Sequence, residues 1–100
     1  MTIPRRIKIL GRTYKVKMAD LGSEYGHPNA WGISQHEDQE VILQSDLPHE
    51  IERSTMWHEV LHAVTFTQFR SLPEEAVEAI SYGEFRVMRD NPKLMQYLLS

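Results

Sequence analysis

The chain has 100 residues, of which 41% are hydrophobic and 25% are charged, and its formal net charge is −3. This length and balance fit one globular domain over residues 1–100, with little room for a second hydrophobic core. The acidic net charge argues against a nucleic-acid partner. The one basic run, residues 5–8, fits the solvent face of a strand.

The chain contains no cysteine, which excludes a disulfide framework and thiolate metal ligands. Any metal must therefore be held by histidine and carboxylate side chains. No apolar run approaches the roughly 18 residues that span a membrane, and no apolar core follows the N-terminal basic residues. We expect a cytoplasmic protein without a membrane partner.

A β-hairpin is the first predicted element. Residues 7–10 and 14–18 alternate apolar with basic side chains around Gly11, a pattern typical of two antiparallel strands with one buried face. Residues 20–29 are rich in Gly, Ser, Pro and Asn and predict a loop. Residues 30–34 predict a short strand.

A further strand over Glu40–Gln44 leads directly into helices. Residues 48–70 contain no Gly and no internal Pro, and their apolar residues recur at helical spacing. Residues 73–89 predict a second helix, and residues 93–99 one or two further helical turns. The prediction is an α+β fold, in which a small antiparallel sheet, made of the hairpin plus an edge strand at 40–44, packs on two helices.

The first predicted helix contains the pattern H-E-x-x-H at His58, Glu59 and His62. Residues four apart lie one above the other on a helix, so both imidazoles can bind one metal ion. Glu59 is placed to reach a water on that metal and to act as general base. The alternative is that these are ordinary helix residues, but the apolar flanks of the motif indicate burial, and buried imidazoles need partners.

A third metal ligand is expected from the second helix. Catalytic zinc usually takes three protein ligands and leaves one position for water. We prefer Glu78, one turn into that helix, with Glu75 as the second choice. The alternative is that these carboxylates are solvated and that the earliest of them favour the positive helix N-terminus. The helix offers four carboxylates: Glu74, Glu75, Glu78 and Glu84.

Other candidate residues are three histidines and one tyrosine. His27, His36 and His49 fit surface positions, although each can also serve as a ligand or a transition-state donor. His49 lies nearly three helical turns before the motif, too far to share its metal. Tyr82, about one turn after Glu78, is either a donor to an oxyanion or a packing aromatic.

Four segments carry a resemblance to the zincin metallopeptidases, in the gluzincin branch, where a Glu on the following helix completes the H-E-x-x-H site. In plan the chain looks like small phage and prophage proteins of minimal gluzincin type, which are similar to metallopeptidase domains of the ImmA/IrrE kind. The segments are Gln39–Leu43, Trp57–Val64, Val77–Ser81 and Arg89–Pro92.

The resemblance implies a sheet of about three strands packed on an active-site helix and a ligand helix. It also implies that His58 and His62 bind Zn²⁺ with Glu78 as third ligand, and that Glu59 is the general base. We therefore expect a zinc-dependent endopeptidase whose peptide or protein substrate pairs with the edge strand. The alternative is a zinc-binding assembly or regulatory protein with a zincin fold and little or no turnover.

Overall fold

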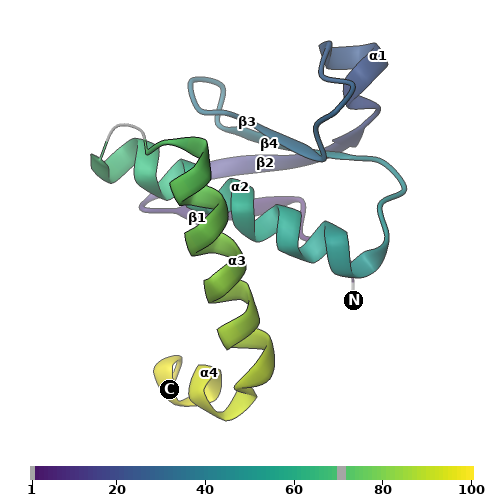
Figure 1. Cartoon of the computed structure of the whole chain (residues 1–100). Coiled ribbons are helices and arrows are strands. Elements are labelled where there is room, and N and C mark those ends of the chain that lie inside the picture. The colour runs from purple at the N-terminus through teal and green to yellow at the C-terminus, as the bar shows by residue number, and fades with distance from the viewer. Residues whose placement is uncertain (1, 70–71) are drawn as a thin grey trace.

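The computed structural model describes residues 2–69 and 72–100, so the predicted helix end at Arg70 lies outside the described residues. A sheet forms in the first half of the chain and helices follow it (Figure 1). The elements are β1 (Arg6–Ile9), β2 (Arg12–Ala19), α1 (Leu21–Tyr25), β3 (Gly32–Gln35), β4 (Glu40–Gln44), α2 (His49–Phe69), α3 (Glu74–Asp90) and α4 (Pro92–Leu98). The predicted α+β class is confirmed.

The sheet has the order β1-β2-β4-β3 and is mixed. The β1–β2 and β3–β4 pairs are antiparallel as expected, whereas β2 and β4 are parallel. Parallel neighbours require a crossover connection, and residues 20–39 provide it. The chain leaves β2, returns as β3 at the outer edge, and β4 then fills the space between β2 and β3.

The expectation that Glu40–Gln44 forms an edge strand is wrong, because β4 lies inside the sheet. Val41, Ile42 and Leu43 are all fully buried. A continuous apolar run of this kind is typical of a strand covered on both faces. The edge beside β4 is formed by β3, which the sequence predicts only as a short strand.

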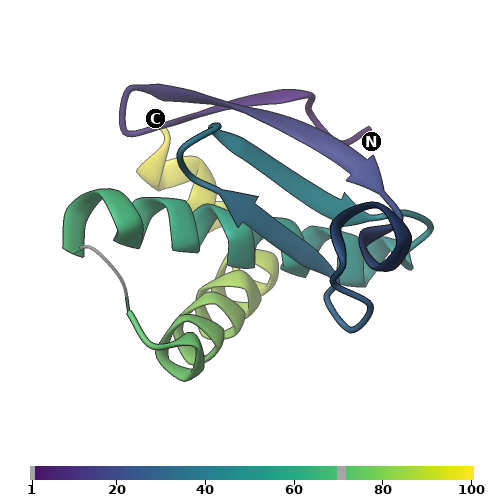
Figure 2. The same cartoon turned by 90° about the horizontal axis from the view of Figure 1, so that it is seen from above.

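The core lies between the sheet and α2, which runs along one face of the sheet (Figures 1 and 2). α3 packs against α2 and carries α4 away from the sheet, as Figure 1 shows. Within the described ranges, no helix is both long and apolar enough to cross a membrane. The buried core cluster consists of Ile9, Tyr14, Val41, Leu43 and Ala63, with Met56, Val60 and Val64 of α2 packed against it.

The predicted loop at residues 20–29 contains the short helix α1. Asp20 caps its N-terminus, where the carboxylate accepts a hydrogen bond from the backbone N–H of Gly22 at 3.1 Å. Leu21 is fully buried, and its N–H donates to the side-chain oxygen of Gln44 at 2.8 Å. The polar composition of residues 20–29 predicts a loop and gives no sign of this helix, which depends on one buried leucine and one N-cap.

The hairpin turn between β1 and β2 carries a local strain that a substitution can remove. Ile9 pairs with Arg12, so Leu10 and Gly11 form a two-residue turn with φ of 50° and 84°. Both angles suit a type I′ turn, which favours Asn-Gly: a Cβ crowds the backbone at positive φ, and Asn offsets this with local hydrogen bonds that leucine cannot form. We expect Leu10→Asn to raise the free energy of unfolding by about 0.5–1 kcal/mol, measured by urea denaturation.

Gly11→Ala is the matched control at the same turn. It introduces a Cβ at positive φ, and we expect it to lower the free energy of unfolding by about 1 kcal/mol. A lower stability for Leu10→Asn than for the wild type would contradict the assignment of this turn.

Candidate metal centre

Two imidazoles from α2 meet edge to face at the centre of the site. His58 and His62 lie one helical turn apart, and their ring centroids are 4.7 Å apart at an interplanar angle of 74°. Their Nε2 atoms are separated by 3.1 Å. His58 is only 7% exposed, whereas His62 is half-buried. The H-E-x-x-H spacing therefore brings two ring nitrogens to one point.

The first residue of α3 completes this cluster. Oε1 of Glu74 lies 2.9 Å from Nε2 of His58, and Oε2 lies 2.9 Å from Nε2 of His62. The Glu74 side chain is 58% exposed, so the cluster opens to solvent on the side of α3. One carboxylate thus faces both imidazoles from a different helix.

The donor set fits a zinc ion. Zinc accepts imidazole nitrogen and carboxylate oxygen, and tetrahedral bonds of about 2.0–2.1 Å place neighbouring ligand atoms about 3.3 Å apart. The separations in the cluster, 2.9 Å and 3.1 Å, are close to that value. His58, Glu59 and His62 also offer ligand atoms within 4.8 Å of one another.

Glu59 is buried beside the cluster and is held by the sheet edge. Its Oε1 accepts a hydrogen bond from Oγ of Ser34 in β3 at 2.6 Å, and the residue is only 5% exposed. Burial raises the pKa of the Glu59 carboxyl, and the hydrogen bond from Ser34 opposes that rise. Among the described residues its other oxygen, Oε2, has no hydrogen-bond partner, which leaves it available to a water or substrate.

Glu78, the third ligand preferred from the sequence, lies one turn further along α3. It lines the same cleft as the histidines, but no hydrogen bond or ion pair joins it to either of them within the described part of the chain. Glu75 and Glu84 are exposed, and neither is among the residues that line the cleft. The carboxylate in contact with both imidazoles is that of Glu74.

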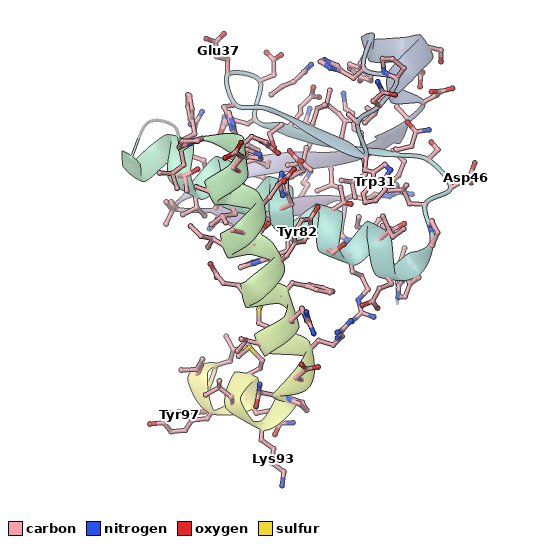
Figure 3. All side chains as sticks on the ribbon, viewed as in Figure 1. Trp31, Glu37, Asp46, Tyr82, Lys93 and Tyr97 are labelled. Carbon is pink, nitrogen blue, oxygen red and sulfur yellow. The ribbon has the colours of Figure 1, made fainter. Side chains whose placement is uncertain are left out.

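The cleft over the cluster has a volume of about 500 Å³ and is bounded by β3, α2 and α3. Trp31 and Tyr82, labelled in Figure 3, line it from the residue before β3 and from α3. The Tyr82 ring centroid lies 5.9 Å from that of His58. Burial, and after it the neighbouring carboxylates, raises the pKa of the Tyr82 phenol, so the hydroxyl remains a donor at neutral pH.

The other three histidines lie outside this cluster. His36, in the turn after β3, stacks on Phe66 with a centroid separation of 4.4 Å, and its Nδ1 is 3.4 Å from the hydroxyl of Tyr14. Burial lowers the pKa of His36, which favours its neutral form. His27 and His49 are exposed, and His49 lines a different pocket near the N-terminus.

Two serines to which the sequence assigns no role contact the motif, Ser34 and Ser81. Ser81 Oγ lies 3.1 Å from Nδ1 of His58. Ser81 follows Glu74 by seven residues, so the two share a helix face, and this periodicity is a signal in the sequence. For Ser34 there is no such signal, because its contact depends on where β3 crosses α2.

Comparison of the chain with protein families, curated proteins and solved structures finds no match.

The approach of β3 to α2 requires a residue without a side chain at Gly32. A Cβ there would lie 2.8 Å from Cγ2 of Thr55 and 3.1 Å from Cγ of Glu59. Thr55 is buried and β-branched, so it has little freedom to move away. We expect Gly32→Ala to lower the free energy of unfolding by about 1–3 kcal/mol, measured by urea denaturation.

Gly83→Ala is the control, because a Cβ at Gly83 in α3 would meet open space. Alanine favours the helix over glycine, so this variant should gain about 0.5–1 kcal/mol. Wild-type stability in Gly32→Ala would contradict the close approach of β3 and α2.

Proposed function

We propose that this protein is a cytoplasmic zinc-dependent endopeptidase. The observation that carries the proposal is the meeting of two imidazole nitrogens and the Glu74 carboxylate beside a buried second carboxylate, Glu59. A purely structural zinc site usually fills all four coordination positions with protein ligands and does not need a buried carboxylate that is not a ligand. The resemblance of the H-E-x-x-H segment to gluzincins supports the same reaction class.

His58 and His62 would hold the metal, and we propose Glu74 as the third ligand on the basis of its contacts with both rings. Glu78 remains the alternative from the sequence. When bound, zinc supplies Lewis-acid polarisation of the scissile carbonyl and activation of water.

Glu59 is proposed as the general base that takes the proton from the attacking water and delivers it to the leaving amine. Ser34 fixes one carboxylate oxygen at 2.6 Å, which leaves the second oxygen for the proton transfer. Tyr82, protonated and beside His58, is placed to donate to the developing oxyanion.

The substrate is proposed to be an extended peptide that pairs with β3. This strand forms the sheet edge and lines the cleft, and the backbone groups on its outer side have no strand partner in the described parts of the chain. An extended peptide can add to such an edge through main-chain hydrogen bonds. Recognition then depends on the backbone more than on side chains, and it takes place at β3 instead of residues 40–44.

Glu59→Gln tests the role of the base. Glutamine can still accept the Ser34 hydrogen bond but cannot take a proton, so we expect zinc to be retained and hydrolysis to fall about 10²–10⁴-fold. Zinc content is measured by mass spectrometry, and cleavage of reduced casein is followed by peptide mass mapping. Glu37→Gln, at an exposed turn, is the control and should cleave as the wild type does.

An unchanged rate in Glu59→Gln would remove the role of Glu59. A wild type that holds zinc but cleaves no protein would favour the alternative, a zinc-binding assembly or regulatory protein.

Zinc affinity separates the candidate third ligands. Because Glu74 contacts both imidazoles, we expect Glu74→Gln to weaken zinc binding about tenfold or more, while Glu78→Gln has a smaller effect. Affinities are measured by competition with a chromophoric chelator. Glu75→Gln, which changes the exposed neighbour, is the control. Full affinity in Glu74→Gln together with loss in Glu78→Gln would assign the ligand to Glu78.

A further inference from the structure

Ser81 is a buried polar residue on α3 that contacts the more buried histidine of the cluster. It is fully buried, and its Oγ lies 3.1 Å from Nδ1 of His58. We propose that Ser81 is a positioning residue that holds the imidazole of His58 with Nε2 directed at the metal. The inference rests on the metal site of the proposed function, but it requires no turnover.

The contact places His58 between two groups of the same helix. Glu74 Oε1 lies 2.9 Å from Nε2, and Ser81 Oγ lies 3.1 Å from Nδ1, so α3 holds both nitrogens of one ring. The two residues are seven apart, which is about two helical turns and the same helix face. His62 differs, because within the described ranges its Nδ1 has no hydrogen-bond partner.

The hydrogen-bond capacity of a serine hydroxyl fits the metal-bound state. A neutral imidazole that binds a metal through Nε2 carries its proton on Nδ1 and needs an acceptor there. The Ser81 hydroxyl has one proton, which it donates to the backbone carbonyl of Glu78 at 3.3 Å. Its lone pairs are then free to accept the Nδ1–H of His58.

The same hydroxyl also fits the metal-free state. There, the Glu74 carboxylate favours a proton on Nε2 of His58, and Nδ1 becomes an acceptor. The Ser81 hydroxyl then turns and donates its proton to Nδ1. Metal binding therefore moves the imidazole proton from Nε2 to Nδ1, with no net change in the protons carried by the pair. An aspartate at position 81 could serve only the first of these states.

Two measurements test the proposal on the full chain. The first is two-bond ¹H–¹⁵N NMR of the wild-type imidazoles, which shows which nitrogen carries the proton. We expect Nε2–H for His58 without metal and Nδ1–H with zinc. The second is zinc affinity by chelator competition, where Ser81→Ala should bind zinc about tenfold more weakly than the wild type.

Ser54→Ala is the matched control, because the Ser54 hydroxyl also donates to a carbonyl three residues earlier on a helix, at 3.1 Å, but does not contact His58. This variant should bind zinc with wild-type affinity. If Ser81→Ala does not fold, the position of the His58 proton in the zinc-loaded wild type, measured by NMR, decides whether the proposal stands.

Wild-type affinity in Ser81→Ala would overturn the proposal, as would Nε2–H on His58 in the zinc-loaded protein. A wild type without zinc affinity would overturn both this inference and the proposed function. Zinc binding with the expected Ser81 effect but without peptide cleavage would leave the inference standing and reject the peptidase.

Discussion

Glu74 places its two carboxylate oxygens 2.9 Å from the Nε2 atoms of His58 and His62, and this contact joins the two long helices at the site. One face of α2 packs on the core beneath the sheet, and its two histidines contact the start of α3. An imidazole buried there needs a polar partner. α3 supplies that partner with its first residue.

The sheet edge fixes the other side of the site. β3 can approach α2 because Gly32 has no side chain, and this approach brings Ser34 within 2.6 Å of Glu59. In the strand order, β3 lies at the outer edge and β4 between β2 and β3. The strand that holds Glu59 is thus also the strand with free backbone groups beside the cleft.

Local patterns in the sequence predict most of the elements but not their arrangement. The alternation in residues 7–10 and 14–18 predicts the hairpin, and helical spacing predicts α2 and α3. The parallel pairing of β2 with β4 depends on contacts across more than twenty residues, which no local pattern encodes. Because this pairing is nonlocal, the sequence predicts residues 40–44 at an edge, although their continuous apolar run is typical of an interior strand.

The site shows the same division. Four-residue spacing places His58 and His62 on one face of α2, and seven-residue spacing places Glu74 and Ser81 on one face of α3. Which carboxylate of α3 reaches the imidazoles depends on where α3 crosses α2. A difference of one turn separates Glu74 from Glu78, and intrahelical spacing cannot distinguish them because both lie on the same face.

The charges of the cluster favour a divalent cation at its centre. Glu74 and Glu59 are two carboxylates close to two imidazoles. Burial is the main cause of the raised pKa of Glu59, and the charge of Glu74 adds to it. The Nε2 atoms of His58 and His62, 3.1 Å apart, cannot both donate to each other. A divalent cation bound by His58, His62 and Glu74 would accept a lone pair from each and lower the repulsion between the Glu74 and Glu59 carboxylates. The same cation would favour the ionised form of Glu59, the form in which that carboxylate can accept a proton.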